Sequence, residues 1–133
     1  MGGASVNITG RVITGIKKGS YFIGMHGYSD QISALFGFVP YPGTLNVLLS
    51  GKEIEKLSVL RRGSGFRIRG FESGGRRFGE VIAYRAETDG IPCAAVMPVL
   101  TTYKDILEIV SGSNLRERLA LKDGVEITVK CFL

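Results

Sequence analysis

Two neutral oxygen donors stand close together in the stretch from Gly43 to Asn46. Thr44 and Asn46 are separated by one residue, so in a strand their side chains leave the same face. A hydroxyl and an amide carbonyl could together hold one Mg²⁺, with water and nucleotide phosphates completing the octahedral shell. Pro40 and Pro42 stiffen the preceding loop, and turn chemistry followed by a polar strand face explains the same residues. The spacing leaves both interpretations open.

A second candidate site is a glycine-flanked loop between two expected strands. It consists of Gly15, Ile16, Lys17, Lys18, Gly19 and Ser20. Backbone N–H groups and the two lysine side chains could surround phosphate groups, because glycine allows the backbone to approach closely. The loop is not a Walker motif, since no Gly-Lys-Ser/Thr sequence opening a helix follows it. A plain hairpin loop with exposed lysines is the alternative.

Hydroxyl groups and a carboxylate follow the apolar run that ends at residue 100. Thr101, Thr102, Tyr103 and Asp105, with Glu108 beyond them, could hydrogen-bond a polyol. An ordinary surface connection with local capping would use the same residue types. These residues are therefore a candidate substrate contact and not an assigned site.

The fourth candidate is the beginning of a short helix. Its residues are Ser113, Asn114, Leu115, Arg116 and Glu117. A helix N-terminus carries unpaired N–H groups and partial positive charge, so this segment could bind an anion or the edge of a base. The alternative is a capped helix without a ligand.

Several common kinds of site are absent from the sequence. Cys93 and Cys131 have no zinc-type spacing, and their apolar neighbours indicate two buried small side chains in a reducing, cytoplasmic compartment. The single histidine, His26, has no serine or cysteine motif beside it that would indicate a catalytic triad. The sequence also contains no dinucleotide-binding fingerprint and no aromatic platform interleaved with basic residues.

The composition fits one globular domain, which we place over residues 6–133. The chain has 133 residues, of which 44% are hydrophobic and 22% charged. Residues 1–5 are small, and we expect them to form a flexible N-terminus, a cloning remnant or a trimmed linker. Since no apolar run is long enough to span a bilayer and no signal peptide opens the chain, we expect no membrane association.

The net charge of +5 indicates an anionic partner, such as a nucleotide, a phosphate or a nucleic acid. Much of the excess comes from arginines at positions 61, 62, 67, 69, 76 and 77, where we expect hairpin surface. Solvated surface arginines explain the same excess. The charge alone therefore does not identify the partner.

Short runs of β-favouring residues predict a mainly β fold. The expected strands cover residues 6–14, 21–25, 44–49, 66–68, 78–86, 94–100 and 125–132. The chain has 19 glycines to supply tight turns between them, and this spacing is typical of a β-barrel rather than a wound parallel sheet. Residues 105–110 are ambiguous between a helical turn and a strand.

Two short helices are also expected. Ser29 can cap a helix over residues 30–36, which Gly37 would end. Ser113 or Asn114 can cap a second helix over residues 115–119. A tight turn at residues 122–124 then leads into the last strand.

Taken together, these segments resemble the archaeal CTP-dependent riboflavin kinases. The most specific stretch runs from Leu35 to Asn46 and contains Gly-Phe-Val-Pro-Tyr-Pro-Gly-Thr-Leu-Asn. Gly10-Arg11-Val12 through Phe22 precedes it, and Leu115-Arg116-Glu117 and Leu121-Lys122-Asp123-Gly124 follow it, in the family's order. The resemblance covers nearly the whole chain. It implies a six-stranded cradle-loop barrel, related to the AbrB-type and double-psi folds, with two or three short helices.

The reaction that the resemblance implies is phosphoryl transfer from CTP to riboflavin. The ribityl 5′-hydroxyl attacks the γ-phosphate of CTP, which gives FMN and CDP. In the family, the glycine-flanked loop wraps the nucleotide, here Gly15 to Ser20, and a short segment closes over its base, here Ser113 to Arg116. We expect a monomer that binds no nucleic acid.

The resemblance also implies the metal and flavin contacts. The Thr and Asn of Gly-Thr-Leu-Asn ligate Mg²⁺, here Thr44 and Asn46, and we expect one ion that arrives largely with the nucleotide. A Thr and a Glu contact the flavin, here Thr101 and Glu108. Glu108 is also the candidate for the general base, or for the group that orients the attacking hydroxyl.

Two features depart from the family pattern. Lys18 stands where relatives carry an acidic residue, which could shift phosphate contacts toward side chains. The stretch from Thr101 to Glu108 is one residue shorter, so Thr102 could be the flavin contact instead. The main alternative function is a DNA-binding regulatory barrel of the AbrB type, and a flavin carrier without catalysis is a further one.

Overall fold

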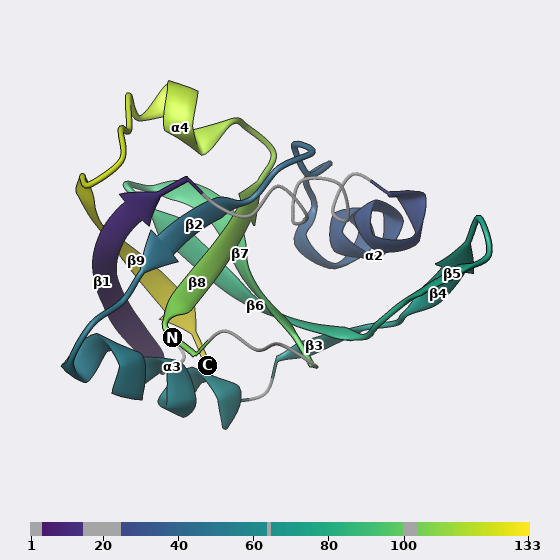
Figure 1. Cartoon of the computed structure of the whole chain (residues 1–133), viewed down its shortest axis with the longest axis horizontal. Coiled ribbons are helices and arrows are strands. Elements are labelled where there is room, and N and C mark those ends of the chain that lie inside the picture. Colours follow the sequence, from purple (N-terminus) through teal and green to yellow (C-terminus); the bar gives the residue numbers. More distant parts are fainter. Residues whose placement is uncertain (1–3, 15–24, 64, 100–103) are drawn as a thin grey trace.

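The computed structural model describes residues 4–14, 25–63, 65–99 and 104–133 of the chain. Seven strands form its main sheet: β1 (Ser5–Ile13), β2 (Leu45–Leu48), β3 (Phe66–Ile68), β6 (Val81–Thr88), β7 (Ile91–Pro98), β8 (Ile106–Ser111) and β9 (Glu126–Phe132). Their order is β3-β6-β7-β8-β2-β1-β9, and a further pairing of β6 with β9 closes six of them into an antiparallel barrel (Figure 1). The expected mainly β, six-stranded barrel is confirmed, with β3 added beside β6.

The inside of the barrel is one apolar core. Alternate residues of each strand point inward, so Leu45 and Val47 of β2 and Leu107 and Ile109 of β8 meet there. Both cysteines also belong to this core and are free, which confirms the expectation of two buried small side chains. Burial raises the pKa of each thiol to about 12, so neither is a reactive thiolate at neutral pH.

A second apolar cluster covers part of the outer face of the barrel. Helix α2 (His26–Phe36) contributes Tyr28, Ile32 and Phe36 to it. Small side chains on the facing strands, such as Ala83 and Ala94, are fully buried beneath the cluster. Gly37 ends α2 in the left-handed conformation, with φ 77°, as the sequence predicted.

A hairpin of β4 (Phe71–Ser73) and β5 (Arg76–Phe78) forms a separate two-stranded sheet that extends away from the barrel (Figure 1). Phe71 stacks on Phe78, with ring centroids 5.1 Å apart. Phe71 also meets the ring of Tyr28 edge to face, at 4.7 Å. The aromatic contacts thus attach the base of the hairpin to α2.

The two remaining helices lie at opposite ends of the barrel (Figure 1). Helix α3 (Lys52–Arg61) buries Leu57 and Leu60 against the barrel core. Helix α4 (Leu115–Arg118) is one turn long and buries Leu115 in the same core. Among the described residues, no helix has the length and apolar character needed to cross a bilayer.

Several expectations about individual elements were wrong. Helix α2 begins at His26 with Met25 as its N-cap, four residues before the expected start, and no side chain caps it. Met25 is therefore not in a strand, and residues 21–24 of that expected strand lie outside the described residues. The expected strand over residues 78–86 is broken between β5 and β6. Helix α3, which holds Arg61, was not predicted.

The structure also decides several points that the sequence left open or placed differently. The ambiguous residues 105–110 mostly form β8, and the residues of the tight turn 122–124 connect to β9 with Gly124 at φ 91°. Asn114, not Ser113, caps α4, since its side-chain oxygen accepts a hydrogen bond from the backbone N–H of Glu117 at 3.3 Å. Strand β1 begins at Ser5, opposite Phe132, so the last of residues 1–5 contributes to the barrel.

Candidate functional site

The proposed metal ligands lie at the beginning of β2. Because Leu45 and Val47 face the barrel core, Asn46 between them faces outward. Asn46 is only 9% exposed, and Thr44, directly before the strand, is half-buried. Thr44 lines an open pocket. The start of β2 therefore carries a hydroxyl and an amide that both lie outside the apolar core of the barrel.

Glu108 lies directly beside Asn46. The two residues are opposite each other in the antiparallel pairing of β2 with β8, a position in which side chains on one face have Cβ atoms about 4.5–5.5 Å apart. Glu108 is half-buried, and its other cross-strand neighbour, Val96, belongs to the outer apolar cluster. Desolvation in this setting raises the pKa of the Glu108 carboxyl above its ordinary value.

A pocket with a volume of about 110 Å³ opens between the loop before β2 and helix α4. It is lined by Tyr41, Gly43, Thr44, Leu45, Ile109, Ser111, Ser113, Asn114, Leu115 and Arg116. Two of the four sequence-predicted segments therefore meet at one concavity. Its lining combines hydroxyl and amide groups with apolar side chains, as is usual for ligand pockets.

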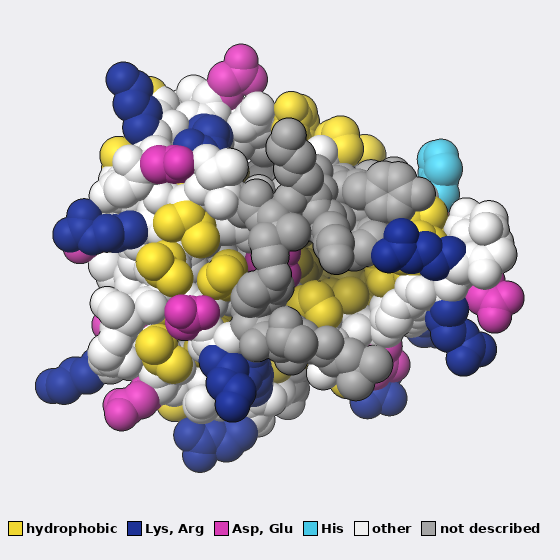
Figure 2. Space-filling view, in the orientation of Figure 1, with side chains coloured by type: hydrophobic (Ala, Val, Ile, Leu, Met, Phe, Trp, Pro, Cys, Tyr) yellow, Lys and Arg dark blue, Asp and Glu magenta, His cyan; other side chains and the backbone are white. Residues whose placement is uncertain are grey.

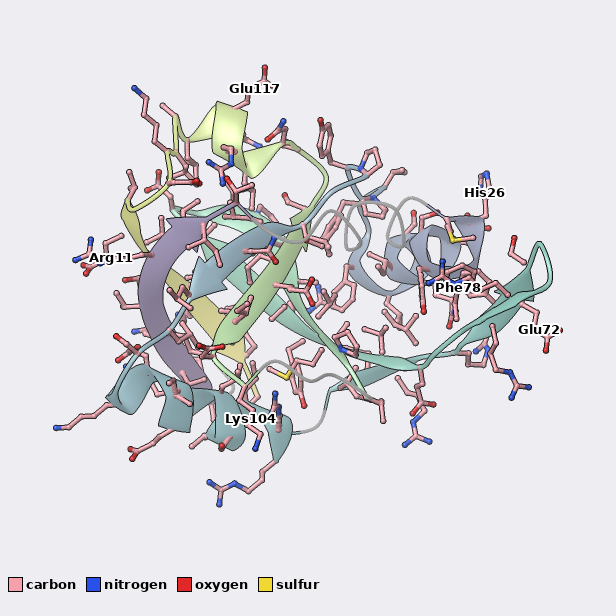
Figure 3. All side chains as sticks on the ribbon, in the orientation of Figure 1. Arg11, His26, Glu72, Phe78, Lys104 and Glu117 are labelled. Atoms are coloured by element: carbon pink, nitrogen blue, oxygen red, sulfur yellow. The ribbon has the colours of Figure 1, made fainter. Side chains whose placement is uncertain are left out.

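Hydrogen bonds join the loop before β2 to the N-cap of α4 and to the end of β8. The side-chain amide of Asn114 donates to the Tyr41 hydroxyl at 3.3 Å, while its oxygen caps the helix. The backbone N–H of Tyr41 donates to the carbonyl of Ser111 at 2.7 Å. Glu117 points away from the barrel (Figure 3), so it is not part of the pocket lining.

Arg116 connects the same segment to the end of β1. Its guanidinium donates to the Ile13 carbonyl at 3.1 Å and pairs with Asp123 at 2.9 Å. The Thr14 hydroxyl donates to the other oxygen of Asp123 at 2.7 Å. Thr14 directly precedes Gly15 in the chain. Thr14, the last described residue before the predicted nucleotide loop, is therefore linked through Asp123 to α4.

The structure brings together only part of the predicted site. Thr44, Asn46, Glu108 and the segment Ser113 to Arg116 lie on neighbouring elements. Gly15 to Ser20, Thr101 and Thr102 lie outside the described residues.

Two residues near the pocket were missed as individual contacts. Tyr41 and Asp123 were noted only as parts of family-like stretches. Their partners are far away in the sequence, so no local pattern could have assigned them a contact.

The donor set fits a cation that is held mainly by its nucleotide. Within the described ranges, no group of three or more His, Cys, Asp or Glu side chains could hold a metal ion. Thr44 and Asn46 offer neutral oxygen atoms, and the Glu108 carboxylate lies next to Asn46. Mg²⁺ accepts such oxygen ligands and usually takes its remaining ligands from water and phosphates.

Among the described residues on the face shown in Figure 2, charge is dispersed. On the face shown in Figure 2, Lys and Arg side chains are spread around the rim, with acidic side chains between them. Some of the hairpin-region arginines are paired: Arg67 contacts Glu80 at 3.4 Å and Arg77 contacts Glu72 at 3.7 Å. The described residues on this face therefore form no continuous basic stripe.

Comparison with known proteins identifies the family. The family model CTP-dep_RFKase, described as "Domain of unknown function DUF120", matches residues 12–131. A protein named riboflavin kinase from Ignicoccus hospitalis is 39% identical over 128 residues, which are 96% of this chain and 72% of that protein. Riboflavin kinases from Thermoplasma volcanium and Archaeoglobus fulgidus are 39% and 38% identical, over 96% and 97% of this chain.

The chain is shorter than these relatives. It spans 58% of the Thermoplasma volcanium protein and 56% of the Archaeoglobus fulgidus protein. The family match over residues 12–131 nonetheless includes β2, β8 and α4, which carry the candidate site. The chain belongs to the CTP-dependent riboflavin kinase family.

Proposed function

We propose that this chain transfers the γ-phosphate of CTP to the ribityl 5′-hydroxyl of riboflavin, giving FMN and CDP. The observation that supports this most strongly is the adjacency of Asn46 and Glu108 next to the pocket that α4 covers. It occurs in a chain whose relatives are named riboflavin kinases. The main alternative, a DNA-binding regulatory barrel, gains no support from these relatives.

Thr44 and Asn46 are proposed to position the triphosphate. They would hold Mg²⁺, which neutralises phosphate charge when it is bound. Their oxygen atoms carry no net charge, so the protein alone should bind the ion weakly and receive it with the nucleotide. Phosphoryl transfer depends mainly on positioning and charge stabilisation, and a stiff strand at the pocket edge serves both purposes.

Glu108 is proposed to act on the attacking hydroxyl. A carboxylate with a raised pKa is a stronger base than one with the ordinary pKa. Partial burial beside Val96 raises the pKa of Glu108 and therefore favours this role. Glu108 would receive the hydroxyl proton as the oxygen attacks the γ-phosphorus, or hold that hydroxyl in the orientation needed for attack on the γ-phosphorus. The flavin would then lie along the outer face of β8, with Thr101 or Thr102 as a further contact.

The nucleotide is proposed to bind between Gly15 to Ser20 and Ser113 to Arg116. The links from Arg116 and Asp123 to Ile13 and Thr14 support this, because they join α4 to the last residues described before the loop. Lys17 and Lys18 would face the phosphates, and backbone groups of the α4 segment would contact the base.

One assay tests the proposed function. Riboflavin is incubated with each of the four common ribonucleoside triphosphates, with and without Mg²⁺, and FMN is separated and quantified by its fluorescence. We expect FMN with CTP and Mg²⁺, and little with ATP, GTP or UTP. Absence of FMN with every nucleotide would contradict a kinase, while equal turnover with ATP would contradict CTP preference.

A further inference from the structure

One side chain links two segments that the proposed nucleotide site needs. Asp123 uses one carboxylate oxygen for the Arg116 guanidinium, at 2.9 Å, and the other for the Thr14 hydroxyl, at 2.7 Å. Arg116 follows the N-cap of α4, and Thr14 directly precedes the glycine-flanked loop. No other described residue is hydrogen-bonded through its side chain to both of these segments.

The turn that carries Asp123 is itself fixed to β1. The N–H of Gly124 donates to the Val12 carbonyl at 2.7 Å, and the N–H of Val12 donates to the Val125 carbonyl at 2.9 Å. The Arg11 guanidinium donates to the Gly124 carbonyl at 2.9 Å. Asp123 therefore projects from a turn whose position does not depend on its own side chain.

These contacts contribute little to folding stability. The side chains of Arg116 and Asp123 are 39% and 55% exposed, and ion pairs at such positions stabilise proteins weakly. A carboxylate that accepts from both partners nevertheless restricts their orientation. The expected consequence of losing it is a less well ordered site in a stably folded barrel.

We infer that Asp123 is a positioning residue for the nucleotide. It acts through Arg116 and Thr14, both of which its carboxylate binds. This inference rests on the proposed function and adds to it a residue that does not touch the reacting atoms.

The test is the Asp123→Asn variant, which keeps the shape of the side chain and removes its charge. We expect KM for CTP to rise about tenfold, with kcat within about twofold of the wild type and KM for riboflavin unchanged. The Kd for Mg²⁺ and CDP, measured by calorimetry, should rise by a similar factor. Glu55→Gln is the matched control, since Glu55 is an exposed carboxylate on α3 at the other end of the barrel, and it should leave all these values unchanged.

A double-mutant cycle shows whether Asp123 acts through its partner. If it does, Asp123→Asn combined with Arg116→Gln should weaken CDP binding no more than Arg116→Gln alone. Fully additive losses would overturn action through Arg116. Unchanged KM and Kd in Asp123→Asn would overturn the positioning role, as would a fall in kcat with unchanged KM.

The outcomes separate this inference from the proposed function. A wild-type chain that binds CDP but forms no FMN contradicts the kinase, and the CDP affinities of the variants still decide the role of Asp123. A wild-type chain that forms FMN while Asp123→Asn behaves identically contradicts only the positioning role. A wild-type chain that neither binds CDP nor forms FMN contradicts both.

Discussion

The two ends of the barrel are each covered by a helix that is tied to β1, but the ties differ in kind. At one end, α3 buries Leu57 and Leu60, which are at most 2% exposed, and Glu53 accepts a hydrogen bond from the backbone N–H of Thr9 at 2.7 Å. At the other end, the single turn of α4 buries only Leu115, and polar side chains make its links to β1. The α3 end is closed by apolar packing, whereas the α4 end stays open beside a pocket.

This difference separates stability from proposed function. A helix held by buried leucines contributes to the free energy of unfolding, but it offers few polar groups to a ligand. A short helix held by exposed ion pairs contributes little to that free energy, yet its backbone and side chains remain accessible. Substitutions at the two ends should therefore change different measurable quantities.

The largest effect is expected at the α3 end. Leu60 is completely buried, so Leu60→Ala should lower the free energy of unfolding by about 2–5 kcal/mol, through lost burial and a cavity. The kcat/KM of the protein that remains folded should be nearly unchanged. Urea denaturation measures the first quantity. Val59→Ala, on the same helix at a residue that is 40% exposed, is the control and should cost far less.

The next effect is expected at the start of β2, beside the pocket. Asn46→Ala and Thr44→Ala should each lower kcat/KM by about 10²-fold or more, because each removes an oxygen atom proposed to position Mg²⁺ and the triphosphate. Steady-state FMN formation gives the value. Asn7→Ala, at an exposed asparagine of β1, serves as the control. Near-normal activity of both Thr44→Ala and Asn46→Ala would contradict the proposed metal site.

A smaller effect is expected for Glu108→Gln, about tenfold or more in kcat, if the carboxylate accepts the hydroxyl proton. Only the ionised form can accept a proton. The wild-type rate should therefore fall as the pH is lowered through the raised pKa of Glu108. This decrease at acidic pH should be absent from the pH–rate profile of the variant. Glu126 is an exposed carboxylate on β9, and Glu126→Gln should show the same decrease in rate at acidic pH as the wild type. Near-normal turnover of Glu108→Gln would exclude the role of base.

The smallest effect is expected for Glu53→Gln, about 1 kcal/mol in the free energy of unfolding, through a weakened hydrogen bond to Thr9. That bond and Lys56 lower the pKa of the Glu53 carboxyl in the folded protein. A lowered folded-state pKa stabilises the protein above the unfolded-state pKa, and this contribution is lost as the pH falls through the folded-state value. Denaturation of both proteins at neutral and strongly acidic pH should show a difference only at neutral pH.

The sequence predicted the features that local chemistry decides. The strand alternation in β1, β2 and β9, the glycine that ends α2 and a cap at Ser113 or Asn114 all depend on neighbouring residues. The structure confirms them, with Asn114 as the cap. Helix α3 was missed although Ile54, Leu57 and Leu60 repeat at a spacing of three, because Gly51 precedes it without a capping side chain. The early start of α2 was missed for the same reason.

The links between segments could not be predicted. Asn46 and Glu108 are joined by the pairing of β2 with β8, and Thr14 and Asp123 by the pairing of β1 with β9. Such contacts depend on how distant strands pair, and a single sequence contains no local pattern for them. The family resemblance indicated the candidate residues of the site, and the fold shows which of the described ones are neighbours.

Amide hydrogen exchange with and without Mg²⁺ and CDP tests the central claim most directly, because it compares the two ends of the barrel in one experiment. We predict slower exchange on nucleotide binding at Tyr41 to Asn46 and Ser113 to Asp123, and no change in α3. Protection confined to α3, or none at the α4 end despite saturating CDP, would contradict the account.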